Sequence, residues 1–359
     1  MAKIFYGVQG SGHGHAVRAL TVARQFPEHE FLFLSFGAGA EILRREYPVE
    51  ELPGPDTVYH DHRLAVFPTL LTNLCFWMRL RATQRRVLEL MDRFQPDAAL
   101  SDYEFLVPRA ARRIGLPCLS LDHQHIITCC RHRVPRRRLP EYWTTAAVIR
   151  LLYHRASEFM VTSFFQPPVR SRGRVKLVPP LLRESVLQRP PQPGEHVLAY
   201  QGHPTFRGFL DFLRQIPHPV KAYGFDRHDQ DGNLRFRKNS EEGFLEDLAS
   251  CRYVVCGAGH TMISEALYYG KPVLSFPIKN AFEQFLNAFY LERLGYGRYH
   301  IGMQPGPGLI PSFEARLDDF TAAIRLADFC GNQEIFSLLD RFIRQKSMSP
   351  GSTGNGSAI

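Results

Sequence analysis

Short apolar runs alternate with longer amphipathic segments along the chain. The first apolar run covers 4–8, and it is followed by a segment from about 16 to 25 with apolar residues at helical spacing. Other strand-like runs lie at 31–36, 98–101, 118–121, 197–200, 220–223, 234–237, 253–256 and 273–276. Because strands that alternate with helices form parallel sheets, the pattern predicts an α/β fold whose sheets are covered by helices on both faces.

The length of the chain and the positions of its prolines predict two domains. At 359 residues the chain exceeds one typical hydrophobic core. Prolines cluster between 179 and 194, where neither a helix nor a central strand can continue. We therefore expect an N-terminal domain at 1–178, a linker at 179–194 and a C-terminal domain at 195–346. The small and polar residues 347–359 are expected to be disordered.

A glycine-containing turn joins the apolar strand at 253–256 to an amphipathic helix. Gly257 and Gly259 let the backbone turn sharply and leave the first amide hydrogens of the helix bare, and such a terminus binds phosphate. Glu265 follows Thr261 by four positions, so both side chains share one helix face. A diphosphate on this terminus would place a ribose beside the carboxylate. The pattern indicates a nucleotide diphosphate site, and an ordinary strand-to-helix turn with a surface glutamate is the alternative.

The residues after this helix follow the order of a known family. They are Gly270-Lys271-Pro272, an apolar strand at 273–276, Pro277 and a polar segment at 280–288. This order resembles the nucleotide-sugar half of GT-B glycosyltransferases, above all the N-acetylglucosaminyltransferases of the lipid-linked peptidoglycan precursor and their uncharacterised bacterial and archaeal relatives. The resemblance implies two Rossmann-like domains that face each other across a cleft.

A second glycine-rich turn lies at 10–15, after the first apolar run. It is not the dinucleotide fingerprint G-x-G-x-x-G, because His15 stands where that pattern needs its last glycine, so a nicotinamide enzyme is disfavoured. In the resembled family a Gly-His pair at this turn places an imidazole at the cleft floor, and Gly14-His15 is the match. Histidine suits the role of a general base near neutral pH. His13 is the neighbouring candidate, and a helix-capping histidine is the alternative.

The resemblance implies the other site residues. Asp102 and Glu104 come directly after the strand at 98–101, at the sheet edge where open α/β folds bind ligands, and Asp102 is expected to orient His15. Carboxylates that only cap a helix are the alternative. The expected nucleotide-sugar residues are Gly12, Gly14, Gly202, Gly257, Ala258, Gly259, His260, Thr261, Glu265, Glu283 and Gln284. The expected acceptor-side residues are His13, Glu104, His123 and His125.

Neither a metal ion nor an organic cofactor is expected. His60-Asp61-His62 and His123-Gln124-His125 have the chemistry of metal ligands, but neither has a partner cluster nearby in the sequence. GT-B enzymes characteristically stabilise the leaving diphosphate with helix amides instead of a divalent ion. The seven cysteines form no CxxC pair, and the start of the chain lacks a signal-peptide pattern. We therefore expect reduced thiols and a cytoplasmic protein without a membrane-spanning segment.

The net positive charge of the chain is concentrated in one window. Between 129 and 176 eleven lysines and arginines stand against two acids, and this excess of nine equals the net charge of the whole chain. The block that precedes the aromatic and aliphatic segment 142–153 consists of Arg131, Arg133, Arg136, Arg137 and Arg138. An apolar patch with a basic rim fits an anionic membrane surface, and 74–81 would extend it. A solvated arginine face is the alternative, and nucleic acid is not an expected partner because no matching motif is present.

These features together predict a glycosyltransferase that moves a sugar from a nucleotide diphosphate to a hydroxyl acceptor with inversion. The resemblance implies a UDP-sugar donor such as UDP-N-acetylglucosamine, whose base is held by the backbone at 239–244. The identity of the hydroxyl acceptor is left open, with a lipid-linked or membrane acceptor as one candidate. Arg18 and His260 depart from the pattern of the family, so the acceptor does not simply carry over. A nucleotide-sugar 2-epimerase and a non-catalytic carbohydrate- or lipid-binding protein remain alternatives.

Overall fold

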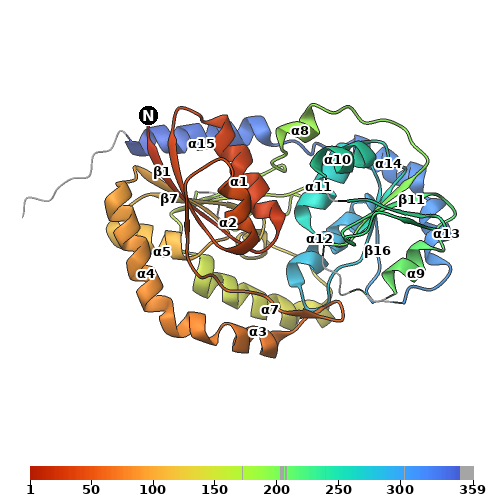
Figure 1. The fold of residues 1–359 in the computed structure, drawn as a ribbon, viewed down its shortest axis with the longest axis horizontal. Helices are drawn as coiled ribbons and strands as arrows, with labels where there is room; N and C mark the ends of the chain where they lie inside the picture. Colours follow the sequence, from red (N-terminus) through yellow and green to blue (C-terminus); the bar gives the residue numbers. More distant parts are fainter. Residues whose placement is uncertain (172, 203–205, 207, 239, 303, 348–359) are drawn as a thin grey trace, which may run out of the picture.

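The computed structural model describes residues 1–347 except 172, 203–205, 207, 239 and 303. The chain forms two lobes that lie side by side (Figure 1). The expected disordered tail lies outside the described residues from 348 onward.

The N-terminal lobe is built on a parallel sheet of seven strands in the order β3-β2-β1-β6-β7-β8-β9. Its strands are β1 (Lys3–Val8), β2 (Glu30–Ser35), β3 (Val49–Glu51), β6 (Ala98–Asp102), β7 (Cys118–Asp122), β8 (Glu158–Thr162) and β9 (Val175–Val178). Strand β1 pairs with β2 on one side and with β6 on the other. The apolar runs predicted as strands are buried on both faces, as parallel sheets require.

Helices cover this sheet, and the N-terminal lobe also contains a small separate hairpin. The helices are α1 (His13–Gln25), α2 (Gly37–Leu43), α3 (Val66–Thr72), α4 (Leu74–Phe94), α5 (Leu106–Ile114), α6 (Ile126–Cys129) and α7 (Leu139–Val148). A 3-10 turn, Arg136–Arg138, precedes α7, and a π-helical turn, Ile149–Tyr153, follows it. Strands β4 (Tyr59–His60) and β5 (Arg63–Leu64) form the separate antiparallel hairpin.

The C-terminal lobe contains the second seven-stranded sheet, in the order β12-β13-β11-β10-β14-β15-β16. Its strands are β10 (Val197–Tyr200), β11 (Val220–Tyr223), β12 (Gln230–Asp231), β13 (Leu234–Phe236), β14 (Val254–Cys256), β15 (Val273–Ser275) and β16 (Gly297–Tyr299). The helices of the second half are α8 (Glu184–Leu187), α9 (Phe209–Leu213), α10 (Glu241–Ala249), α11 (His260–Tyr268), α12 (Phe282–Arg293), α13 (Leu309–Glu314), α14 (Leu317–Arg325) and α15 (Asn332–Ser347). All pairings are parallel except that of the edge strand β12.

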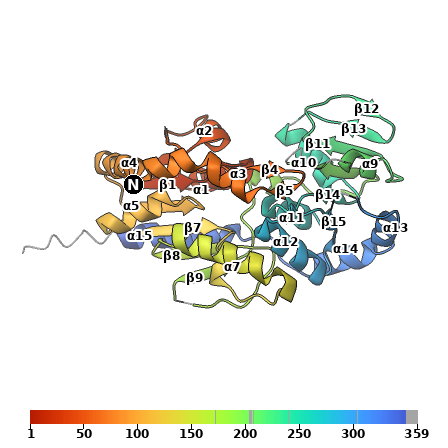
Figure 2. The same cartoon turned by 90° about the horizontal axis from the view of Figure 1, so that it is seen from below.

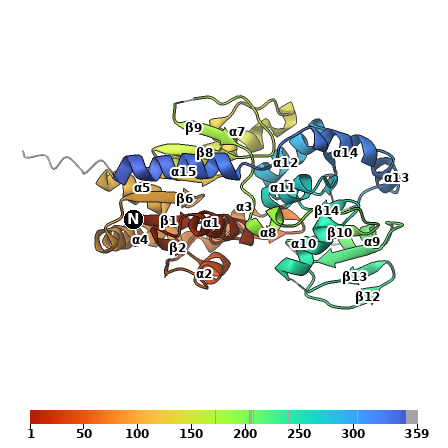
Figure 3. The same ribbon diagram turned by 90° about the horizontal axis from the view of Figure 1, so that it is seen from above.

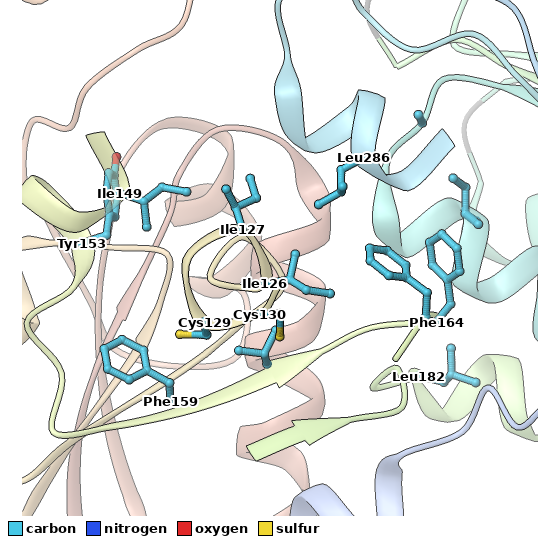
Figure 4. Close-up of a cluster of buried hydrophobic side chains, with 14 of the residues drawn as sticks. Ile126, Ile127, Cys129, Cys130, Ile149, Tyr153, Phe159, Phe164, Leu182 and Leu286 are labelled. Carbon is cyan, nitrogen blue, oxygen red and sulfur yellow. The ribbon is translucent and has the colours of Figure 1, made fainter. Parts of the chain in front are cut away.

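The last helix joins the two lobes. Helix α15 lies along the N-terminal lobe (Figures 1 and 3) and buries Ile335, Leu339 and Phe342 in the core that contains Ile4 and Leu100. A second buried cluster continues from one lobe into the other. Figure 4 shows part of it, from the N-terminal lobe to Leu286 of α12. The lobes are therefore held together by apolar packing as well as by the chain itself.

Both sheets have the strand order of doubly wound nucleotide-binding folds, so the predicted fold class of two Rossmann-like domains is confirmed. In each sheet the order reverses beside the first strand, between β1 and β6 and between β10 and β14. Ligands bind at the carboxyl ends of strands at such switch points. The turns at 9–12, 103–105, 201–202 and 257–259 follow these four strands, so the fold places the predicted site turns where a ligand is expected.

Candidate active site

His15 and Asp102 form a hydrogen-bonded pair at the switch point of the first sheet. Residue Val8 of β1 pairs with Asp102 of β6, and the turn after β1 returns the chain into α1. Gly12 makes that turn at φ 80, a left-handed conformation that favours glycine. Nδ1 of His15 lies 2.7 Å from Oδ1 of Asp102, whose side chain is completely buried. Because a carboxylate only accepts, Nδ1 donates in this pair, and the tautomer with its proton on Nδ1 carries the lone pair of the ring on Nε2.

Arg18 completes this group. It lies one helical turn after His15 and donates from Nε to Oδ2 of Asp102 at 2.7 Å and from Nη2 to Oδ1 at 2.6 Å. Burial opposes the charged guanidinium, but the charge and hydrogen bonds of Asp102 raise the pKa of Arg18 above its ordinary value. The sequence showed Arg18 only as a departure from the family pattern. Its spacing of three positions from His15, which places both side chains on one helix face, was the available signal that Arg18 could also reach Asp102.

The glycine turn of the second sheet leads into α11, and the described residues provide no side-chain cap for this helix. A pocket of about 160 Å³ lies beside it, at the carboxyl ends of β10, β14 and β15. Its lining includes four predicted donor-site residues: Gly202, Gly257, Gly259 and Gln284. Residues 203–205, which follow the predicted Gly202, lie outside the described residues, as does residue 239 of the segment expected to hold the base.

The first turns of α1 and α11 approach each other closely. A β-carbon added to Gly14 would lie 2.9 Å from Oγ1 of Thr261, which is closer than real side chains come. A side chain at residue 14 would therefore require Thr261 to move. The contact places the N-terminus of α1, where His15 lies, beside the N-terminus of α11, where the predicted phosphate-binding amides lie.

Glu265 is buried on α11 and has a partner that sequence reasoning missed. Arg183 donates from Nε and Nη2 to its two carboxylate oxygens at 2.8 and 2.9 Å, and the same guanidinium lies 3.2 Å from Glu241. Burial raises the pKa of Glu265, and the charge of Arg183 opposes that rise. The ion pair fixes the orientation of the carboxylate, so a ribose hydroxyl would have to share Glu265 with Arg183.

His260 and His123 stack across the junction of the lobes, with ring centroids 3.9 Å apart. His123 donates from Nδ1 to the carbonyl of Thr162 at 2.8 Å, and its Nε2 lies 2.7 Å from Oδ1 of Asn287 on α12. Burial lowers the pKa of both histidines. Asn287 in turn donates to the carbonyl of Ala258 at 3.0 Å, which ties this junction to the glycine turn.

Two other predicted acceptor-side residues, Glu104 and His125, have hydrogen-bond partners of their own within the N-terminal lobe. Glu104 accepts the backbone amides of Leu106 and Val107 at 2.6 and 2.7 Å, so it caps α5, and burial raises its pKa to about 7. His125 is buried beside Asp122, with Nδ1 at 2.7 Å from Oδ2. These contacts match the helix-capping alternative for Glu104 and give His125 an interior position.

Two further predicted residues have separate surroundings. His13 is exposed at the start of α1. Glu283 accepts a hydrogen bond from Gln124 at 3.1 Å across the junction of the lobes. Of the two candidate bases, His15 is the one that the structure pairs with Asp102.

A larger cavity, which the sequence did not reveal, lies on the N-terminal side. It has a volume of about 830 Å³ and is lined by the turn after β1, the start of α2 and the segment from Glu51 to Tyr59. Its lining includes Ser11 and Gly12, directly before α1. Small-molecule sites typically measure roughly 300 to 1,000 Å³, so this cavity is large enough for part of an acceptor. Among the described residues, no three His, Cys, Asp or Glu side chains gather as metal ligands.

Two Rossmann-like lobes that meet at these turns define the GT-B class of glycosyltransferases. The sequence matches the model of glycosyl transferase family 1 over residues 2–317, so the chain belongs to glycosyl transferase family 1.

Individual relatives agree with this assignment. An uncharacterized glycosyltransferase of Methanosarcina acetivorans is 25% identical over 335 residues, which cover 82% of this chain and 85% of that protein. The crystal structure of the calicheamicin glycosyltransferase CalG4 has a TM-score of 0.69 at 16% identity and covers 98% of this chain and 100% of its own. MurG of Acinetobacter baumannii has a TM-score of 0.61 at 16% identity, with 94% and 99% covered. At these identities the solved structures support the fold alone.

Proposed function

We propose that this glycosyltransferase transfers a sugar from a nucleotide diphosphate donor to a hydroxyl acceptor with inversion, and that His15 is the general base. The observation that carries the proposal is the hydrogen bond from His15 to buried Asp102. His15 lies in the first turn of α1, which contacts the first turn of α11. Nε2 removes the acceptor hydroxyl proton as the oxygen bonds to the anomeric carbon. The bond from that carbon to the diphosphate oxygen breaks, and the bare amides of α11 stabilise the charge that develops on the leaving group.

The donor occupies the C-terminal lobe in this proposal. Gly257 and Gly259 approach the diphosphate, and Glu265 accepts hydrogen bonds from the ribose while Arg183 holds it. Glu283 and Gln284 contact the sugar, as in the resembled family, and that resemblance also favours a UDP-sugar such as UDP-N-acetylglucosamine. Gln284 accepts the amide of Ile278 at 3.0 Å, so its position beside the pocket is fixed.

We also propose that the acceptor is lipid-linked and that the protein works at the cytoplasmic face of a membrane. Large apolar side chains are exposed on α3 and α4 and around α7, which lie on the same side of the N-terminal lobe (Figures 1 and 2). These residues, called the apolar patch below, are Val66, Phe67, Leu70, Leu71, Leu74, Met78, Trp143, Val148 and Leu151. Exposed apolar clusters of this kind mark contact surfaces.

The arginine block supports the same surface. Arg131, Arg133, Arg136 and Arg137 are exposed, and each can attract anionic lipid with about 1 kcal/mol near the membrane. Arg138 instead contacts Glu141 at 2.7 Å and lies over the ring of Phe285, so it is used within the protein. In the described part of the chain, every helix is too short or too polar to cross a bilayer.

The proposal is tested by a thermal-shift screen with UDP-, dTDP- and GDP-sugars, followed by nucleotide release with hydroxyl acceptors. A true donor class raises the melting temperature, because only ligands that bind the folded state stabilise it. Nucleotide release that requires the acceptor supports transfer. An epimer formed from donor alone, detected by NMR, would instead indicate the 2-epimerase, and no response to any donor would contradict the proposal.

A further inference from the structure

The β4–β5 hairpin of the N-terminal lobe reaches across to the donor lobe. The amide of Leu64 donates to the carbonyl of Lys279 at 2.9 Å, and the amide of Lys279 donates to the carbonyl of His62 at the same distance. Lys279 belongs to the segment that follows β15, at the sheet edge that carries the donor pocket. Two backbone hydrogen bonds therefore attach the tip of the hairpin to this edge.

The tip has an unusual backbone. Asp61 and His62 are the two residues between the strands, and both have positive φ, 45 and 54. Two-residue hairpin turns of this kind favour Asn-Gly or Asp-Gly, since a side chain at the second position is strained. Backbone strain of this sort is maintained where the surrounding contacts impose it, and it occurs preferentially at functional sites. At this tip the second residue with positive φ is His62, where glycine would be favoured.

The imidazole of His62 enters the donor lobe. The side chain is 6% exposed, and Nε2 donates to the carbonyl of Phe276 at 3.0 Å. The ring stacks on Phe206 with centroids 4.9 Å apart. His62 lines the same pocket as Gly257, Gly259 and Gln284, so one wall of the donor pocket comes from the opposite lobe.

We propose that His62 is a donor-binding residue that contacts the sugar of the nucleotide-sugar. This rests on the proposed function, because it requires the pocket beside α11 to be the donor site. At about 160 Å³ the pocket is smaller than the roughly 300 to 1,000 Å³ of complete ligand sites, so it holds one part of the donor. Backbone groups of glycines, an amide side chain and an imidazole are partners for sugar hydroxyls.

The test compares His62→Asn with His60→Ala in the full chain. Asparagine tolerates positive φ, so the hairpin is kept while the imidazole is lost. His60 lies on the same hairpin, but its side chain is 73% exposed, which makes it the matched control. Calorimetry measures the Kd of the best nucleotide-sugar and of the corresponding nucleoside diphosphate for both variants and the wild type. A second variant, Asp61→Asn with His62→Gly, places the favoured Asn-Gly sequence in the turn. If His62→Asn unfolds, the same Kd values are measured on this variant.

We expect the loss of the imidazole to weaken nucleotide-sugar binding about five- to tenfold, the effect of about one hydrogen bond, with nucleoside diphosphate binding and the His60→Ala control unchanged. Equal Kd values for the nucleotide-sugar in a folded His62 variant and the wild type would overturn the inference. Equal weakening for the nucleoside diphosphate would overturn the sugar contact. If the wild type binds no nucleotide-sugar, the proposed function itself fails. This result differs from the two outcomes above, in which the wild type binds and only the role of His62 is rejected.

Discussion

Arg18 holds both carboxylate oxygens of Asp102. The two hydrogen bonds, of 2.7 and 2.6 Å, connect α1 to the end of β6, and both side chains are buried. A planar guanidinium makes such a two-point contact in one orientation. Arg18 therefore fixes the plane of the carboxylate that receives the His15 hydrogen bond, and it compensates a negative charge that has no contact with solvent.

Replacing Arg18 with Met should lower both stability and turnover. Removing one partner of a buried ion pair costs about 3 to 5 kcal/mol, because the remaining charge stays uncompensated. The kcat should fall while the Kd of the donor stays near the wild-type value, since Arg18 acts through Asp102 and not on the nucleotide. Urea unfolding and steady-state kinetics measure the two effects, and Arg18→Lys should restore part of both. An unchanged kcat in a folded Arg18→Met variant would remove this role.

Glu265→Gln should weaken the proposed contact with the ribose of the nucleotide. A neutral amide of the same size accepts weaker hydrogen bonds from the two ribose hydroxyls, so the Kd of UDP should rise about tenfold. The Kd of 2′-deoxy-UDP should change less, because this nucleotide offers one hydroxyl fewer. Calorimetry with both nucleotides gives the comparison. If the two affinities fall by the same factor, the loss reflects the broken Arg183 ion pair and not a ribose contact.

His132 should make the protein less stable in mild acid. Burial lowers the pKa of His132 to about 4, and its Nε2 lies 2.7 Å from the carbonyl of Ile126. The unfolded chain binds this proton near pH 6.5, so the stability from neutral His132 is fully present above that pH and is lost as pH falls towards 4. His132→Gln should reduce the loss of stability between pH 7 and pH 5 by roughly 1 kcal/mol, since partial exposure weakens the full effect. Urea unfolding at pH 7 and pH 5 measures the free energy of unfolding of both proteins. If it changes by the same amount between the two pH values in the wild type and in the variant, the prediction is refuted.

The apolar patch should determine binding to anionic vesicles. Phe67 and Leu70 are 70% and 59% exposed on α3, so Phe67→Glu with Leu70→Glu adds charge without disturbing a core. We expect this variant to lose flotation with phosphatidylglycerol vesicles at low salt. Leu326→Glu, at a site 91% exposed in the C-terminal lobe, is the matched control and should float like the wild type. Flotation of all three proteins, or of none, would contradict a membrane role for the patch.

The elements that could be predicted from the sequence carry their signals locally. The strand predicted at 197–200 coincides with β10, because a short apolar run between prolines and polar residues has few other structures. The glycine turns at both switch points were also predictable, since glycine marks turns that other residues avoid. Ser240 caps α10 through a hydrogen bond from Gly243, as its position before two acids indicates.

The residues that sequence reasoning missed depend on long-range contacts. Arg183 lies 82 positions before Glu265, and no local pattern connects them. The hairpin at 59–64 has two-residue strands and a turn without glycine, so neither periodicity nor turn chemistry predicts it. His62 therefore stood out only as one of two histidines near an aspartate. Glu104 was expected on the acceptor side, with helix capping as the alternative, and its carboxylate caps the helix that begins two residues later.

His15→Ala separates the chemical step from donor binding. The imidazole contacts Asp102, and the proposed donor contacts come from the C-terminal lobe, so its removal should leave the Kd of the nucleotide-sugar unchanged by calorimetry. The kcat should fall by about 10² to 10⁴, the usual contribution of a general base. A His15→Ala enzyme that binds its donor normally and turns over at the wild-type rate would contradict the proposed mechanism.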